Sequence, residues 1–226
     1  MALPWALAVL SLLPLLDARS PVCANFTAAP LTNSTLDRLS GKWFYIAGAS
    51  RNPEFKEAAK TFQAAFFYFA LNHTEDTIEL RQYLTVGNHC VYESSILNVH
   101  RENKTISKRE KDKERVVSMI LTTDPKIYML AQDPDDEQNN PSLPRPPTQA
   151  SQHPHPAPLL TPAADKPEVT SEQLKVLHEA IECKGLDKSE IIYADVKKDQ
   201  CGPLEKQHEE ERKKTNEEPQ EDAEQG

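Results

Sequence analysis

The sequence predicts an all-β protein, an up-and-down antiparallel barrel of about eight strands around a small cavity, followed by one C-terminal helix. Three observations support this fold class. Short strand-like runs separated by polar breaks fill residues 39–133, and a helical spacing of apolar residues appears only after residue 170. An apolar leader with four N-glycosylation sequons assigns the chain to the secretory pathway, where its four cysteines can form disulfides.

Residues 1–18 form a predicted signal peptide. Residues 2–16 are almost wholly apolar but shorter than the roughly 20 residues of a membrane span, and Ala18 suits a cleavage site. The leader has no Lys or Arg before its apolar core, which departs from the usual pattern and leaves an uncleaved signal anchor as the alternative. No later stretch is apolar enough to span a membrane, so we expect a secreted, extracellular product.

The four sequons begin at Asn25, Asn33, Asn72 and Asn103. A glycosylated asparagine carries a bulky, hydrated sugar, so each of these positions is predicted to be exposed.

Between residues 39 and 133 the strand signals follow one another at hairpin spacing. Residues 61–70 contain five aromatic residues, and residues 76–85 and 91–99 alternate between apolar and polar side chains. Residues 116–122 and 127–131 are predicted to form a hairpin around Pro125, because proline suits a turn. In the segment 76–85 we expect one apolar face and one largely wet face.

A sheet of six to eight such strands leaves two edges exposed unless it closes. Closure at about eight strands leaves an interior that can hold one small ligand. The alternative is a sandwich of immunoglobulin type, but no tryptophan lies between Cys90 and Cys183, as that fold would require. We therefore assign residues 19–200 to a single barrel domain.

Residues 134–167 interrupt this domain with ten of the 18 prolines of the chain. Proline lacks the backbone donor that a central strand needs, so we expect a disordered loop here and no strand between residues 141 and 162. The last barrel strand is then missing or replaced. His153 and His155 fall in this loop, where two ligands on a flexible chain are poorly suited to hold a metal, so no metal site is expected.

The C-terminal part begins with a helix. Thr170 and Gln173 make a capping box, apolar residues recur at helical spacing over residues 171–183, and Gly185 ends the pattern. We expect this helix to pack on the outside of the barrel, followed by a short strand at 191–194. Residues 201–226 are rich in Glu, Lys and Gln and are predicted to be an acidic tail that is either disordered or a frayed helix.

Charge and motifs exclude several functions. The net charge of -9 disfavours nucleic acid and anionic membranes as partners. No catalytic motif is present, and none of Cys23, Cys90, Cys183 and Cys201 lies in a CxxC pair. Two disulfides are expected, with three possible connectivities.

Gly41-Lys42-Trp43, near the start of the strand region, resembles the G-x-W signature of the lipocalins. The resemblance extends to Phe66–Phe69, Arg101–Asn103, Ala164–Glu168 and Pro203–His208. It implies a barrel whose Gly41 and Trp43 are structural and whose disulfides join Cys23 to Cys183 and Cys90 to Cys201. Relatives carry aromatic residues where this chain has Ser50 and Gln132, so part of the pocket is expected to be smaller or more polar.

The resemblance also implies a function. Such a protein is an acute-phase plasma carrier with an immunomodulatory role, which binds small lipophilic, often basic, molecules such as drugs, steroids and lipids and needs no cofactor. The ligand-binding residues that it implies are Tyr45, Phe55, Phe67, Phe69, Ile106, Lys108 and Leu130. One alternative is a glycoprotein that acts through its N-glycans on lectins or cell-surface receptors. The other, an isomerase with a pocket thiol, would need an unpaired cysteine.

Overall fold

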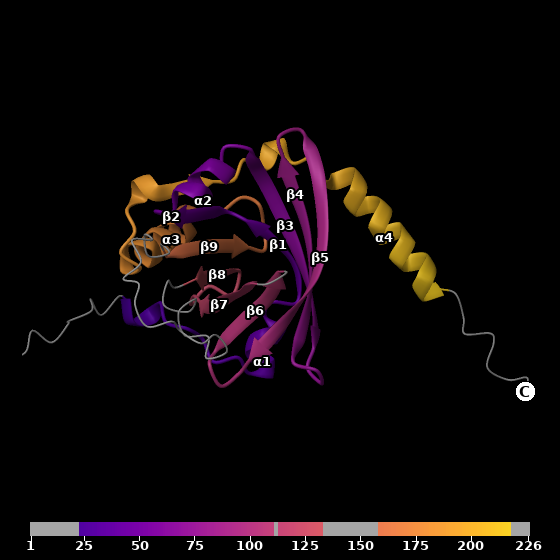
Figure 1. Ribbon diagram of the computed structural model, residues 1–226, viewed down its shortest axis with the longest axis horizontal. Coiled ribbons are helices and arrows are strands. Elements are labelled where there is room, and N and C mark those ends of the chain that lie inside the picture. Colours follow the sequence, from indigo (N-terminus) through magenta and orange to yellow (C-terminus); the bar gives the residue numbers. More distant parts are fainter. Residues whose placement is uncertain (1–22, 111–112, 133–157, 218–226) are drawn as a thin grey trace, which may run out of the picture.

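The computed structural model describes residues 23–110, 113–132 and 158–217 (Figure 1). The described strands form one antiparallel sheet that closes on itself, because β1 pairs with both β3 and β9. If β1 and β2, which Ile46 separates, are counted as one kinked strand, eight strands close the barrel and β10 adds to β2 outside it. The closed barrel confirms the predicted fold class.

The strands are β1 (Gly41–Tyr45), β2 (Ala47–Ser50), β3 (Phe62–Asn72), β4 (Thr77–Val86), β5 (His89–His100), β6 (Thr105–Glu110), β7 (Lys113–Leu121), β8 (Ile127–Gln132), β9 (Leu159–Ala164) and β10 (Ile191–Tyr193). The helices are α1 (Asn33–Asp37), α2 (Pro53–Ala58), α3 (Ser171–Cys183) and α4 (Gly202–Glu217). Short 3-10 turns are η2 (Cys23–Asn25), η3 (Lys188–Glu190) and η4 (Val196–Lys198). None of the helices in the described ranges is both long and apolar enough to cross a membrane.

Strand β9 corrects the expectation that the last barrel strand is missing or replaced and that no strand forms between residues 141 and 162. It pairs with β8 on one side and with β1 and β2 on the other, although it contains Pro162. In a strand, the N–H and C=O of one residue point to the same side, and the carbonyl of Pro162 accepts from the Ile46 amide at 3.1 Å. The Ile46 carbonyl, which a non-proline residue would bind there, accepts instead from Ala194 at 2.9 Å. The missing proline donor therefore leaves no carbonyl unpaired.

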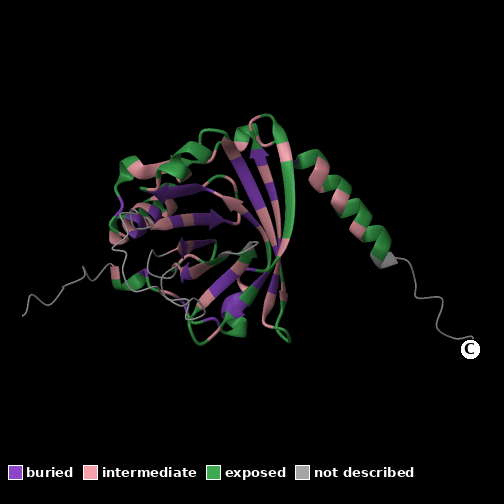
Figure 2. Cartoon of the chain, viewed as in Figure 1, coloured by how far each residue is buried: buried purple, intermediate pink, exposed green. Residues whose placement is uncertain are grey.

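With β1 and β2 counted as one strand, the shortest strand pairing in the described barrel wall is between β5 and β6. These two strands pair over three residues only, Asn98–His100 with Thr105–Ser107. Most of the first eight residues of β5 are exposed, as Figure 2 shows in green. The sequence did not reveal β6 as a strand, because its polar residues Ser107, Lys108 and Arg109 hide the alternation.

Helix α3 covers the outer face of β7, β8 and β9, as predicted. Its buried residues Leu177, Ala180 and Ile181 pack against the outward-facing Met129 and Leu160. The predicted capping box is present, since the Thr170 hydroxyl accepts from the Gln173 amide and the Gln173 side chain accepts from Thr170.

Helix α4 shows that the tail is helical up to residue 217, where the sequence left a disordered segment and a frayed helix as alternatives; residues 218–226 lie outside the described residues. It leaves the wall on the side opposite α3 (Figure 1). Its first turns contact an outward-facing aromatic cluster on β3 and β4: Glu205 binds Lys42 and Tyr68, and the His208 ring bonds to the Tyr83 hydroxyl at 3.0 Å. Tyr83 is consequently fully buried, whereas Glu79 and Arg81 on the same face are half-buried, so the outer face of β4 is exposed only in part.

Both disulfides follow the pairing that the family resemblance implied. Cys23 joins Cys183 at the end of α3, and Cys90 on β5 joins Cys201 just before α4. They link residues 160 and 111 positions apart, and in the chain-entropy account each closure of that length stabilises the fold by roughly 4 to 5 kcal/mol. The predicted leader, His153 and His155 lie outside the described residues.

Candidate ligand-binding cavity

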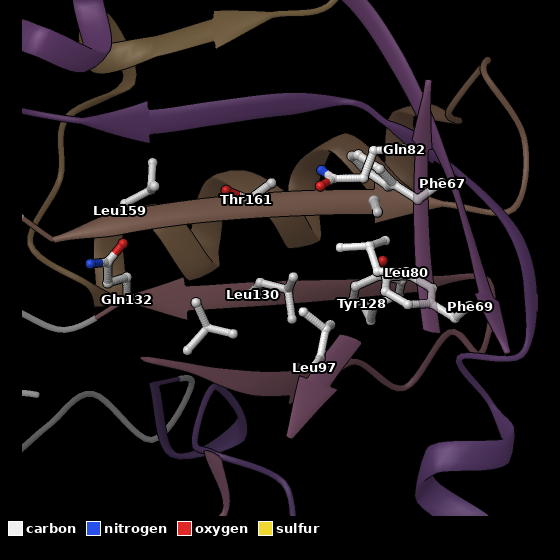
Figure 3. A pocket seen from close by; sticks show the side chains of 12 residues that line it. Phe67, Phe69, Leu80, Gln82, Leu97, Tyr128, Leu130, Gln132, Leu159 and Thr161 are labelled. Carbon is white, nitrogen blue, oxygen red and sulfur yellow. The ribbon is translucent and has the colours of Figure 1, made fainter. Parts of the chain in front are cut away.

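A cavity of about 170 Å³ lies inside the barrel (Figure 3). Twelve side chains line it: Phe67, Phe69, Leu80, Gln82, Leu97, Val117, Tyr128, Leu130, Gln132, Leu159, Thr161 and Ala163. Most are apolar, so water inside the cavity is poorly hydrogen-bonded and an apolar guest can replace it.

The strand period of two explains this lining. Successive side chains of a strand point to opposite faces, so alternate residues of β3, β4, β8 and β9 enter the barrel. Phe67 and Phe69 lie two residues apart on β3, with ring centroids 6.4 Å from each other. On β9 the inward set begins at Leu159, whereas Leu160 and Ala164 point outward and pack under α3.

The closed end of the barrel is built around Trp43. Its indole N–H donates to the Leu39 carbonyl at 2.8 Å, and its ring meets the Tyr128 ring edge-on at 4.7 Å. Gly41 starts β1 with φ of +105°, a conformation that favours glycine. Trp43 therefore supports the cavity wall through its contact with Tyr128.

Of the seven residues predicted to bind ligand, the structure brings three to the cavity wall: Phe67, Phe69 and Leu130. Ile106 is buried in the adjacent core, opposite Val117 on β7. Lys108 lies on β6 next to the part of β5 that extends beyond the pairing of these two strands, where its ammonium group pairs with Glu93 at 2.6 Å.

Tyr45 and Phe55 lie near the cavity mouth and not in its lining. Both side chains approach Gly48 so closely that a Cβ atom there would lie 2.3 Å from the Tyr45 hydroxyl and 2.5 Å from the Phe55 ring. The Tyr45 ring also packs edge-on against Phe62 at 4.9 Å, and burial raises the pKa of the Tyr45 hydroxyl. This contact closes the wall where α2 leaves β2.

Nine lining residues were not among the predicted ligand-binding residues. Leu80 and Gln82 belong to the alternating set of β4, and Tyr128 and Gln132 belong to the set of β8, so the period of two could have identified them. Gln132 places an amide in the lining, whereas Ser50 is buried outside the lining and accepts from the Asn52 amide at 3.1 Å. No sequence pattern identified the β9 lining residues, because the proline-rich composition of their segment argued against a strand.

The polar groups of the lining are neutral. Gln82, Gln132, Thr161 and Tyr128 supply amides and hydroxyls, and the lining residues that the structure describes include no carboxylate. Within the described part of the chain, the buried Tyr128 hydroxyl has no hydrogen-bond partner. Burial raises its pKa, so it stays protonated at neutral pH and can donate one hydrogen bond.

The isomerase alternative can be checked against the cysteines. All four cysteines are in disulfides, which removes the thiol that the isomerase alternative requires. Among the residues described, no group of three or more metal-ligating side chains comes together. The four sequon asparagines are all exposed.

Comparisons with known proteins agree with this architecture. The model of the Lipocalin / cytosolic fatty-acid binding protein family matches residues 40–141. Alpha-1-acid glycoprotein of Bos taurus is 50% identical over 96% of this chain and 99% of its own, and that of Oryctolagus cuniculus is 48% identical over 95% and 98%. The solved structure of the siderocalin Ex-FABP matches with a TM-score of 0.52 at 10% identity, over 70% of this chain and 93% of that chain, which is a likeness of fold alone.

These two relatives match nearly the full length of the chain at about half of its positions. Alpha-1-acid glycoproteins are secreted and are not enzymes, which confirms the expected extracellular location and the expected lack of catalysis. The chain belongs to the alpha-1-acid glycoproteins, within the lipocalin family.

Proposed function

We propose that the protein is a plasma carrier that holds small lipophilic molecules, including basic drugs, steroids and lipids, by reversible burial in the barrel cavity. The observation that supports this most is a largely apolar cavity in a barrel that β9 closes despite its proline. The acute-phase and immunomodulatory roles that the family implies belong to the same proposal.

Affinity would come mainly from apolar burial. Removing apolar surface from water contributes roughly 25 cal/mol per Å², and Phe67, Phe69 and Leu130 offer such surface on two sides of the cavity. The two phenyl faces can also attract an ammonium group, at about 0.5 to 2 kcal/mol.

Selectivity would come from few polar groups. Because the lining is neutral, a basic ligand is expected to place its ammonium group against the phenyl faces or the amide oxygens of Gln82 and Gln132. An oxygen or nitrogen acceptor near the cavity floor can bind the Tyr128 hydroxyl. Cationic ligands should therefore bind with modestly higher affinity than neutral ligands of the same shape.

A fluorescence titration tests the proposal. With the leader removed, Trp43 is the single tryptophan of the chain, and it contacts Tyr128 of the cavity wall. The probes are a lipophilic aryl tertiary amine and its neutral carbon isostere. Phe67→Ala should weaken binding of both probes about tenfold or more, since it removes a lining ring.

Phe62→Ala is the matched control, because Phe62 lies on the same strand and packs on Tyr45 outside the lining. It should leave both affinities within about twofold, well below the change of 1.4 kcal/mol that a tenfold effect represents. Equal losses in the two variants, or saturation of neither probe in the native protein, would argue against the carrier function.

A further inference from the structure

Three of the four sequons lie at one end of the barrel. Asn72 ends β3 at the turn to β4, and Asn103 lies in the turn from β5 to β6. In a meander, alternate hairpin turns lie at the same end of the strands. The β3–β4 and β5–β6 turns therefore lie at the same end of the barrel (Figure 1). Asn33 begins α1, which occupies this closed end as well.

Arg101 ties the three sequon segments together. Its guanidinium donates to Asp76 at 2.8 Å, to the Leu31 carbonyl at 2.7 Å and to the Asn33 side-chain oxygen at 2.8 Å. A second link joins His73 beside Asn72 to Asp37 at the end of α1, at 2.8 Å. The segments therefore hold fixed positions relative to one another.

The hydrogen bonds of Asn33 and Asn72 do not use the side-chain nitrogen that would carry the sugar. Asn33 accepts from Arg101, and Asn72 accepts from the amides of Thr74 and Glu75, each through the side-chain oxygen. The sugar is attached to the side-chain nitrogen, so these bonds can persist after glycosylation. They would orient the two linkages rather than compete with them.

The cavity mouth is at the other end. The loop with α2 and the turn from β4 to β5 meet there, with the Gly87 amide donating to the Thr61 carbonyl at 2.7 Å. Gln82, Gln132 and Leu159 line the cavity near this end, whereas Phe69 and Tyr128 lie toward Trp43. The fourth sequon, Asn25, is tethered elsewhere, beside the disulfide to the end of α3.

We propose that the glycans on Asn33, Asn72 and Asn103 form a single multivalent face at the closed end, which docks on an oligomeric glycan-binding protein while the cavity mouth stays accessible. The closed-end glycan face is defined by these three residues. Docking through it does not depend on the carrier function, whereas the statement about the mouth rests on that function.

Multivalent binding predicts how strongly the protein is retained on a glycan-binding protein. Linked binding events raise retention by about 10² to 10⁴ over a single event, provided that geometry lets them engage together. Three glycans on one rigid end meet this condition against a dense lectin surface. The same number of glycans split between the two ends does not.

The first experiment measures retention on a densely immobilised tetrameric mannose-binding lectin. The full mature protein is produced in cells that leave high-mannose glycans, and intact mass confirms occupancy. Asn72→Gln should shorten retention about tenfold or more. Ala59→Asn creates a sequon with Thr61 beside α2 at the mouth, so the double variant Asn72→Gln/Ala59→Asn restores the glycan number. Retention should stay short in this double variant.

The second experiment measures exchange of the fluorescent amine from protein saturated with the same lectin. Exchange should be unchanged within about twofold for the native glycoprotein and slowed several-fold for Ala59→Asn, with Ala59→Gln as the unglycosylated control. Full recovery of retention by the mouth glycan, an empty closed-end sequon, or slowed exchange in the native form would overturn the proposal. Failure of the amine to bind at all would overturn the carrier function and the claim about the mouth, but not docking through the closed-end face.

Discussion

The two ends of the barrel differ in construction. At the closed end, Trp43 and Tyr128 are buried and in ring contact, and Trp43 is bonded to the Leu39 carbonyl. At the mouth, amide side chains and the half-buried Leu159 line the cavity. Among the described residues, β5 has no partner strand on one side for most of its length. We therefore expect truncation at the closed end to cost more stability than truncation at the mouth.

Truncation at each end should give the largest contrast. Trp43→Ala should lower the free energy of unfolding by about 3 to 5 kcal/mol, as for other large buried aromatics. Leu159→Ala at the mouth should cost about 1 to 2 kcal/mol, since Leu159 is only half-buried. Urea unfolding followed by circular dichroism measures both, and equal losses would refute the contrast.

Tyr128→Phe should change stability in the opposite direction. Removing a buried hydroxyl that has no partner in the described residues should raise the free energy of unfolding by about 1 kcal/mol. The same variant should weaken ligands that carry an acceptor and spare their hydrocarbon analogues. Thermal unfolding of the unliganded protein decides the first point, and destabilisation would mean that the hydroxyl is already paired.

Acid should loosen the closed end by a smaller amount. The hydrogen bond from Arg101 holds the pKa of Asp76 below its ordinary value of 3.8. A carboxyl with a lowered folded pKa stabilises the protein above its unfolded pKa and loses that contribution as pH falls through the folded value. The stability difference between native protein and Asp76→Asn should therefore be constant above about pH 5 and shrink below pH 3.8.

Unfolding midpoints from about pH 7 down to about pH 2 measure this difference. The matched control is Asp195→Asn, which removes an exposed carboxylate outside the closed end. If both variants follow the same pH dependence, the Asp76 to Arg101 link contributes nothing specific.

The sequence predicts some elements better than others. Helix α3 displays a capping box and an apolar stripe, which are local signals, whereas the G-x-W resemblance identifies Trp43. Strand β9 could not be predicted, because Pro162 is tolerated only when Ala194, distant in sequence, supplies a donor to Ile46.

For a similar reason, the sequence could not decide between a helix and a disordered segment at α4. Its own residues are polar, and its contacts are ion pairs and ring contacts with β-strand residues such as Lys42 and Tyr83. Of the predicted cavity residues, Phe67, Phe69 and Leu130 follow the strand period, whereas Lys108 lies in a strand whose partner Glu93 no local pattern reveals.

Filling the cavity tests the carrier account most directly. Thr161 is half-buried, belongs to β9 and faces the cavity, so Thr161→Phe should occupy the space that a ligand needs. The account predicts that the native protein binds the lipophilic amine with one-to-one stoichiometry, and that Thr161→Phe binds it at least about tenfold more weakly while remaining folded. Undiminished affinity in a folded Thr161→Phe protein would place the ligand elsewhere and contradict the account.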